Sequence, residues 1–287
     1  MNRAVLVTGG SRGIGAAIAR AFAERGERVA VHYRDDGRAA EAVRGSLAGD
    51  GHLAVRADLT DPEAVRAMVD AAADGLGGLD VLVNNAGIYV DHPVLGTSYE
   101  EWQEAWRATL GVNLTGAANV TWCAVRHMMA ASGPPAEAIS ADGGRSRDER
   151  TGRWIGARTG GRNDARTGAR TGGRIVNVGS RGAFRGEPTH PAYGASKAGL
   201  HAFGQSLAVA LAPHGITVAS VAPGYVATDM TAQELATPAG HAIRAQSPFN
   251  RVATPQEVAA AVVYLASPEA AWSSGAVLDL NGASYLR

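Results

Sequence analysis

Tyr193 and Lys197 stand four residues apart, a spacing that places two side chains on the same face of a helix. Lys197 is the only lysine in the chain; the other 26 of the 27 Lys and Arg residues are arginines. Burial can shift the pKa of a lysine ammonium, which an arginine does not allow. An ammonium beside a phenol lowers the tyrosine pKa from about 10. The pair is a candidate general acid and base, and the alternative is a leftover surface lysine.

A second group of candidate residues follows the first apolar segment. Gly9, Gly13 and Gly15 are spaced Gly-x-x-x-Gly-x-Gly where a strand pattern gives way to a helix pattern. Glycines permit a tight turn close to a pyrophosphate, and the start of a helix offers N–H groups to that anion. This pattern predicts a dinucleotide site.

Two further positions bear on the nucleotide. Asp58 follows the third apolar segment and could accept from an adenine amino group, or could cap the next helix. An acid at the end of the second strand would hold the free 2′-hydroxyl of NAD, whereas arginine accommodates the 2′-phosphate of NADP. That strand ends at Tyr33-Arg34, and Arg12 lies in the glycine turn. We therefore expect NADP(H) to be favoured over NAD(H), although two acids follow directly.

The elements that must position these residues alternate regularly along the chain. Helices are expected at about 13–25, 37–47, 109–131 and from 61, 193 and 255; strands are expected at 4–7, 29–33, 53–57, 81–83, 175–178, 216–221 and 276–280. The strands are almost entirely apolar, as in a sheet that is covered on both faces. Strict alternation implies right-handed βαβ units. We predict one α/β domain over residues 1–287, with seven parallel strands in a doubly wound sheet and helices on both faces.

Residues 133–173 depart from this alternation. Arg-Thr-Gly recurs there at Arg150, Arg158, Arg166 and Arg170, with almost no apolar periodicity. Such a segment cannot bury enough apolar surface to offset the entropy lost on ordering. We interpret it as a low-complexity, arginine- and glycine-rich insertion that forms a surface loop. The alternative is a basic arm for an anionic partner or a neighbouring subunit.

The composition narrows the function classes. The 46% apolar content allows a sizeable core, and a formal net charge of zero argues against a nucleic-acid partner. Cys123 is the only cysteine, so a reducing compartment fits. We find neither a signal peptide nor an apolar run of the ~18 residues that a membrane span needs. No His/Cys/Asp cluster has metal-ligand spacing, so we expect no catalytic metal in a soluble, cytoplasmic protein.

In their order along the chain, these motifs resemble the short-chain dehydrogenase/reductase family. The resemblance covers nearly the whole chain outside the insertion; it rests on residues 8–15 and 84–87, and on Asn113, Ser180, Tyr193, Lys197, Pro223, Gly224 and Thr228. It implies a single-domain Rossmann fold that binds a nicotinamide cofactor.

The resemblance also implies four catalytic residues. Tyr193 would be the general acid for carbonyl reduction, and Lys197 would bond the nicotinamide ribose and lower the pKa of Tyr193. Ser180 would hold the substrate oxygen, and Asn113 would anchor a water in a proton relay through Lys197. By residue type alone, Tyr193 could equally be a packed tyrosine, Ser180 a turn serine and Asn113 a bridging amide.

The cofactor and substrate residues are expected at one edge of the sheet. We expect residues 229–252 to form a substrate lid, and His92 to be a polar wall rather than a catalyst. The predicted cofactor-binding residues are Gly9, Ser11, Arg12, Gly13, Ile14, Gly15, Tyr33, Arg34, Asp58, Leu59, Asn85, Ala86, Gly87, Tyr193, Lys197, Pro223, Gly224, Val226 and Thr228. The predicted substrate-pocket residues are Tyr89, His92, Phe184, Tyr225 and Met230.

The sequence looks most similar to the 3-oxoacyl-acyl-carrier-protein reductases and related ketoreductases of this family. The prediction is an NADP(H)-dependent oxidoreductase that reduces a ketone or 3-oxoacyl-type carbonyl to a secondary alcohol. The alternatives are an NAD-dependent alcohol, polyol or sugar dehydrogenase, and a catalytically silent cofactor-binding regulator. Residues 206–214 carry no lysine or arginine, which favours a free ketone or specialised acyl thioester over a carrier-borne substrate. The resemblance implies a homotetramer, or a dimer. From the net charge and the apolar runs we expect no nucleic-acid or membrane partner.

Overall fold

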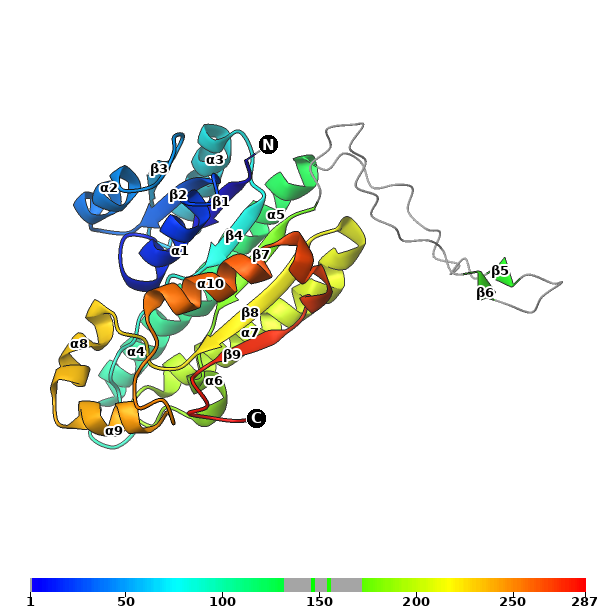
Figure 1. Cartoon of the computed structure of the whole chain (residues 1–287). Helices are drawn as coiled ribbons and strands as arrows, with labels where there is room; N and C mark the ends of the chain where they lie inside the picture. Colours follow the sequence, from blue (N-terminus) through cyan, green and yellow to red (C-terminus); the bar gives the residue numbers. More distant parts are fainter. Residues whose placement is uncertain (1, 132–145, 148–153, 156–171) are drawn as a thin grey trace.

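A parallel sheet of seven strands forms the centre of the molecule, in the order β3-β2-β1-β4-β7-β8-β9 (Figure 1). The computed structural model describes residues 2–131, 146–147, 154–155 and 172–287. The predicted α/β class and the seven parallel strands are confirmed. The strands are β1 (Ala4–Val7), β2 (Arg28–Tyr33), β3 (Leu53–Arg56), β4 (Val81–Asn84), β7 (Arg174–Val178), β8 (Thr217–Pro223) and β9 (Val277–Leu280).

Helices cover both faces of this sheet. On one face lie α1 (Gly13–Ala23), α2 (Gly37–Gly45) and α10 (Pro255–Leu265); on the other lie α3 (Pro62–Leu76), α5 (Ala117–Ala131) and α7 (Pro191–Leu211) (Figure 1). Neighbouring β1 residues alternate between two buried clusters, with Val5 facing α1 and Leu6 facing α3. Burial on both faces explains why the strands read as continuous apolar runs.

The order of the strands reverses between β1 and β4. In doubly wound sheets, ligands bind beyond the carboxyl ends of the strands at such a switch point. Short elements gather at this edge: α6 (Gly182–Arg185), α8 (Asp229–Ala236) and α9 (Ala239–Ala245). Two 3₁₀ turns, Ala212–His214 and Pro268–Ser273, lie elsewhere in the described chain.

The helix predicted over residues 109–131 is longer than expected. It begins as α4 (Tyr99–Leu110), passes through a π-helical segment (Gly111–Gly116) and continues as α5. Ser98 caps it, because its hydroxyl accepts from Glu101 N at 3.2 Å while the Glu101 carboxylate accepts from Ser98 N at 3.0 Å. This reciprocal pair is a start signal that the apolar pattern alone does not reveal.

Most of the predicted insertion, 133–173, lies outside the described residues. Two strands of two residues each, β5 (Ser146–Arg147) and β6 (Trp154–Ile155), pair antiparallel within it. The described chain resumes at Gly172 and leads into β7. No helix in the described part of the chain is both long and apolar enough to cross a membrane.

Candidate active site

The turn between β1 and α1 has a backbone that only glycine fits. Gly9 and Gly13 have positive φ angles of 62° and 53°. A Cβ on Gly15 would stand 2.1 Å from the backbone oxygen of Gly9, a contact that no side chain could relieve. The spacing seen in the sequence therefore reflects two backbone conformations and one close backbone approach.

Residues 84–87, at the end of the neighbouring strand β4, hold this turn in place through hydrogen bonds. The Asn85 amide nitrogen donates to Thr8 O at 2.9 Å and to Gly9 O at 3.1 Å. The Thr8 hydroxyl in turn accepts from the backbone N–H groups of Asn85 at 2.9 Å and Ala86 at 3.1 Å. The predicted proximity of these two motifs is thus a set of specific hydrogen bonds.

A buried histidine that sequence reasoning missed supports the same turn. His32 Nδ1 accepts from Gly9 N at 3.0 Å, which leaves Nε2–H to donate to Ala57 O at 3.1 Å. Burial lowers the pKa of His32, in agreement with a neutral ring in this role. A lone histidine within an apolar strand was the available signal.

The start of α1 fits the pyrophosphate of a dinucleotide. Arg12 occupies the N-cap without a side-chain hydrogen bond to the helix, and the first turn holds no acid. The first backbone N–H groups and the positive end of the helix dipole therefore meet no competing carboxylate from that turn. Thr228 reaches this place from the β8 side, since its methyl lies 3.3 Å from where a Gly13 Cβ would be.

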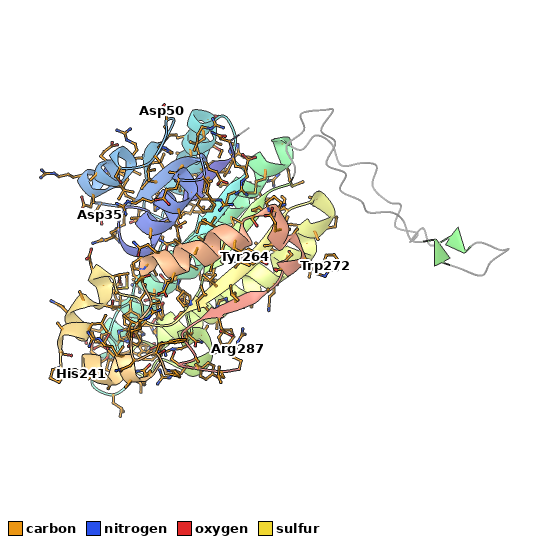
Figure 2. All side chains as sticks on the ribbon, in the orientation of Figure 1. Asp35, Asp50, His241, Tyr264, Trp272 and Arg287 are labelled. Atoms are coloured by element: carbon orange, nitrogen blue, oxygen red, sulfur yellow. The ribbon has the colours of Figure 1, made fainter. Side chains whose placement is uncertain are left out.

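Two exposed arginines flank the place expected for the adenosine ribose. Arg12 is exposed, and Arg34 bonds through Nε to Asp35 at 2.6 Å with half of its side chain in solvent. Figure 2 shows Asp35 on the outer side of the molecule near α2. The Tyr33 ring packs beside Gly37 at the start of α2. The guanidinium of Arg34 thus remains accessible to an anion.

Asp58 organises a turn and does not cap the next helix. Its Oδ1 accepts from the backbone N and hydroxyl of Thr60 at 2.9 and 2.7 Å, and these bonds lower its pKa. Asp61 is the cap of α3, accepting from Glu63 N and Ala64 N. The helix-cap alternative for Asp58 is therefore wrong.

Several predicted cofactor residues point into the protein. Leu59 is buried against Gly116, and Val226 is buried beside β8 and forms a bridge with Ala253. Ile14 packs on the core beneath α1. Only the backbone of Leu59 and of Val226 is therefore left to meet a ligand. Ser11 and Gly87 lie partly exposed at this edge, where Pro223 ends β8 and Gly224 follows it.

Tyr193 and Ser180 meet at the carboxyl edge of the sheet. Tyr193 lies in the first turn of α7, and Ser180 lies two residues beyond β7. The Ser180 hydroxyl bonds the phenol, and Gly182 N donates to Ser180 Oγ at 2.9 Å. Burial raises the pKa of Tyr193 to about 12, a rise that the bond to Ser180 opposes. The phenol is therefore held in its protonated form.

Lys197 lies on the same face of α7 as Tyr193, as the spacing predicted. Its Nζ is 5.7 Å from the centre of the Tyr193 ring and donates to Val178 O at 2.9 Å. Burial lowers the pKa of Lys197 to about 8. Burial dominates the pKa of Tyr193 in this structure, and the opposing effect comes from Ser180. The expected lowering of the Tyr193 pKa by Lys197 stays a prediction.

Asn113 bridges two elements around Lys197. Its Oδ1 accepts from Ile88 N at 2.8 Å, and its Nδ2 donates to Ile88 O at 3.0 Å and to Ser196 Oγ at 3.1 Å. Ser196 Oγ donates to Tyr193 O at 2.8 Å, a link that sequence reasoning missed. The bridging-amide interpretation of Asn113 is confirmed. A Cβ on Gly87 would lie 3.4 Å from both Asn113 Oδ1 and Lys197 Nζ, so glycine keeps the space beside them open.

An aromatic wall stands next to Tyr193. The Tyr89 ring meets the Tyr193 ring edge-on at 4.8 Å and stacks on His190 at 3.5 Å. The Tyr89 hydroxyl donates to Glu187 at 3.4 Å, and burial raises the pKa of that carboxyl. Glu187 is a third residue that the sequence did not single out, after His32 and Ser196.

Three predicted pocket residues have surroundings that the sequence did not indicate, and for Phe184 and Met230 the pocket role stays a prediction. His92 is 1% exposed, and its ring is held by Val90 O at 2.7 Å and Ala192 N at 3.1 Å, so it is a structural tie rather than a pocket wall. The Phe184 ring stacks on His201. Met230 is 64% exposed on α8. Tyr225 does line a cavity, and its hydroxyl donates to Glu234 at 3.3 Å.

Known proteins are similar to this chain in sequence and in fold. Residues 3–145 match the family model for short chain dehydrogenase, and residues 162–282 match the model for Enoyl-(Acyl carrier protein) reductase. The 3-oxoacyl-(acyl-carrier-protein) reductase FabG of Vibrio cholerae is 35% identical over 99% of this chain and 98% of its own. The cis-4-hydroxycyclohexanecarboxylate dehydrogenase of Sinomonas cyclohexanicum is 36% identical over 98% and 95%. A short chain dehydrogenase from Burkholderia cenocepacia, solved in complex with NADP, is 33% identical with a TM-score of 0.77, covering 98% and 97%.

The chain therefore belongs to the short-chain dehydrogenase/reductase family. Within that family it is an oxidoreductase close to the 3-oxoacyl-acyl-carrier-protein reductases, and it uses a pyridine nucleotide.

Proposed function

We propose that the protein is an NADP(H)-dependent reductase that converts a ketone or 3-oxoacyl-type carbonyl to a secondary alcohol. The observation that carries this proposal is the position of the Tyr193 phenol, which is bonded to Ser180 and has Lys197 Nζ 5.7 Å from its ring centre, at the same edge as the glycine turn. A buried phenol with a high pKa can bond a carbonyl oxygen without losing its proton prematurely.

The proposed roles follow from these contacts. When bound, the cofactor supplies the hydride. Ser180 orients the substrate oxygen, and Tyr193 donates its proton to the alkoxide as charge develops there. Lys197 is positioned by Val178 O to hold the nicotinamide ribose, and Asn113 fixes the segment that includes Ile88. The turn residues Gly9–Gly15 and the N-terminus of α1 hold the pyrophosphate.

The preference for NADP(H) rests on Arg12 and Arg34. Both guanidinium groups are exposed beside the glycine turn, where a 2′-phosphate can receive charge-assisted hydrogen bonds. The relative from Burkholderia cenocepacia, solved in complex with NADP, supports this choice.

A free ketone or a specialised acyl thioester is the favoured substrate. The exposed end of α7 offers no lysine or arginine to an acidic carrier protein. The named relatives act on a 3-oxoacyl group in one case and on a cyclic hydroxy acid in the other, so the family site accepts both substrate types. Helices α8 and α9 would serve as the lid over this substrate.

Association into a homotetramer or dimer in the cytoplasm completes the proposal. Tyr264 and Trp272 project from the surface near the edge strand β9, and Trp272 is fully exposed (Figure 2). Exposed aromatic side chains beside an unpaired strand edge are typical of surfaces that meet another subunit. We interpret the insertion, 133–173, as a surface loop outside the catalytic unit.

The test is NADPH oxidation against a panel of free ketones, 3-oxoacyl thioesters and simple sugars. We expect turnover with the first two classes, at least tenfold faster with NADPH than with NADH. Oxidation of sugars or polyols with NAD alone would favour the dehydrogenase alternative. A chain that binds NADPH but turns over none of the panel, with Tyr193→Phe leaving its properties unchanged, would contradict enzymatic function.

A further inference from the structure

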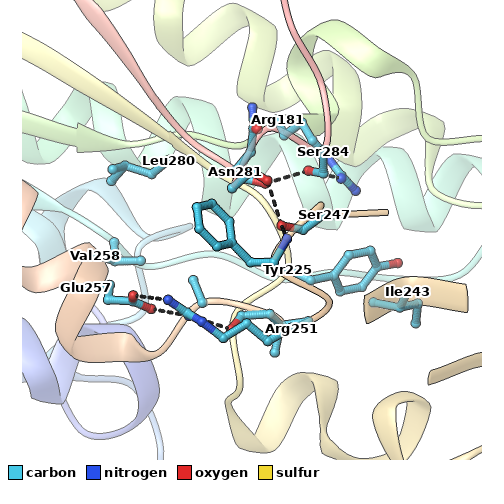
Figure 3. Close-up of a pocket in the computed structure, with 14 residues that line it drawn as sticks. Arg181, Tyr225, Ile243, Ser247, Arg251, Glu257, Val258, Leu280, Asn281 and Ser284 are labelled. Carbon is cyan, nitrogen blue, oxygen red and sulfur yellow. Dashed lines mark hydrogen bonds and ion pairs between the residues drawn. The ribbon is translucent and has the colours of Figure 1, made fainter. Parts of the chain in front are cut away.

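A cavity of about 260 Å³ lies beside the catalytic edge, between the end of β8, the end of β9 and helices α9 and α10 (Figure 3). Its walls are mostly apolar, with Ile243, Phe249, Val258 and Leu280 among the lining residues. Arg181 and Tyr225 also line it, whereas Tyr193 does not. This volume is below the ~300–1,000 Å³ typical of pockets for drug-sized ligands, so a small molecule is the appropriate occupant.

Arg181 is the unusual group in this cavity. It is only 5% exposed, yet no carboxylate lies within ion-pair distance of it among residues 2–131 and 172–287. Its one side-chain hydrogen bond within that part of the chain goes from Nη1 to Ser284 Oγ, at 2.6 Å. The guanidinium also lies 5.6 Å from the centre of the Tyr225 ring. Most of its five N–H donors therefore have no strong partner.

Arg181 differs from Arg251, the other arginine in the cavity, because no carboxylate in the described part of the chain is paired with it. Arg251 is bonded to both carboxylate oxygens of Glu257, at 2.8 and 2.6 Å, and is thereby neutralised. Burial of a guanidinium without a carboxylate is costly and is normally compensated by an anion. The cavity thus has one positive charge within apolar walls that no direct ion pair from the described residues neutralises. The half-buried Glu187 carboxylate acts on it only from beyond ion-pair distance.

We propose that this cavity is a binding site for a small monocarboxylic acid with an apolar body, and that Arg181 is the residue that recognises it. A planar guanidinium matches a carboxylate through two parallel hydrogen bonds. One spare charge suits a monoanion better than a phosphate dianion. The acid is either the distal end of the substrate or a separate small molecule.

The site lies close enough to the reaction centre for either source. Arg181 directly follows Ser180, and its backbone N donates to Pro223 O at 2.8 Å. Tyr225 links the cavity to the lid, because its hydroxyl donates to Glu234 of α8. A ligand on Arg181 would therefore contact the residues that border both the substrate oxygen and the lid.

Binding is tested by calorimetry on the full chain with hexanoate and benzoate, using hexanamide and benzamide as neutral controls of the same shape. We expect each acid to bind at least tenfold more tightly than its amide. In Arg181→Met this preference should vanish, whereas Arg185→Met, which removes a neighbouring arginine outside the cavity, should retain it. Equal binding of acid and amide, or no binding of either acid up to about 10 mM, would overturn the proposal.

Thermal unfolding guards against a variant that simply fails to fold. Removal of an unpaired buried charge should leave the Tm of Arg181→Met equal to or above that of the wild type. Each acid should raise the Tm of the wild type and not that of the variant. A variant that is strongly destabilised and a wild type that the acids do not stabilise would together contradict the proposal.

The two sources are separated by kinetics, and only this arm rests on the proposed function. If the substrate supplies the carboxylate, Arg181→Met should raise KM at least tenfold for a keto acid and leave KM for its methyl ester unchanged. If a separate acid binds, benzoate should change turnover of a neutral ketone without competing with it. Calorimetric binding needs no turnover, so its failure is distinct from failure of the reductase assignment.

Discussion

The glycine turn and the catalytic group around α7 share the carboxyl edge of the sheet, but they are built by different means. At the β1–α1 turn, positive φ angles and a 2.1 Å exclusion at Gly15 leave room for backbone alone. Around α7, by contrast, burial keeps Tyr193 protonated and lowers the pKa of Lys197 to about 8. One region is specified by shape and the other by desolvated charge.

The largest effect is expected from removal of the phenol. Tyr193→Phe should reduce kcat/KM for a ketone by about 10³- to 10⁴-fold, because proton donation and orientation are lost together. NADPH binding, measured by fluorescence titration, should change less than threefold. Tyr264→Phe, which alters an exposed tyrosine on α10, is the matched control. Activity in Tyr193→Phe within tenfold of wild type would remove Tyr193 from the mechanism.

A substitution in the glycine turn should weaken nucleotide binding through steric overlap alone. Gly15→Ala places a Cβ against the Gly9 carbonyl, so we expect at least 100-fold weaker NADPH binding and a loss of about 3 kcal/mol in stability. Gly45→Ala is the control, since a Cβ there meets nothing within 4 Å. That variant should be neutral or slightly more stable. Equal NADPH affinities in the two variants would contradict the steric argument.

Lys197→Met tests the charge specification through pH. Because burial lowers the pKa of Lys197 from 10.5 to about 8, the folded protein holds fewer protons than the unfolded chain between those values. This group therefore costs about 3 kcal/mol below pH 8, and the cost disappears as the pH rises to 10.5. The lost bond to Val178 O offsets about 1 kcal/mol of the gain.

The variant should accordingly be about 2 kcal/mol more stable than wild type at pH 7 and about 1 kcal/mol less stable near pH 10.5. Urea unfolding at both pH values measures the crossover. Tyr193 is present in both proteins, so its own titration cancels in the difference. A stability difference that does not change with pH would show that Lys197 is not desolvated.

The smallest effect is expected from the exposed arginines beside the glycine turn. Arg34→Gln should lower the preference for NADPH over NADH by about tenfold, because it removes a charge-assisted contact with the 2′-phosphate. The effect should shrink at high salt, since Arg34 lies in solvent. Arg20→Gln on α1 should leave the preference unaltered. Unchanged discrimination in Arg34→Gln would favour an NAD-dependent enzyme.

The difference between the glycine turn and the catalytic group also explains what could be predicted from sequence. The glycine spacing and the apolar strands follow from local sterics and two-sided burial, so the turn and all seven strands of the main sheet were predicted with boundaries close to those observed. The Tyr-Lys spacing correctly placed both side chains on one face of α7.

Properties set by tertiary packing could not be predicted in this way. The pKa of Tyr193 depends on how completely the surrounding elements exclude water from the phenol. His92 looked like a pocket residue, yet backbone groups from two segments hold its ring. Glu187 and Arg181 became notable only once the fold showed Glu187 half-buried beside Tyr89 and Arg181 buried beside Tyr225.

The direction in which Asn113 projects depends on the number of residues in the π-helical segment Gly111–Gly116. Such a segment is an α-helix with one surplus residue, so deletion of a single residue would restore a regular helix and turn Asn113 by ~100° about the axis. The amide would then leave Ile88 and Ser196 while both flanking helices kept their faces. Single-residue length changes within this stretch should therefore be excluded, even where substitutions are tolerated.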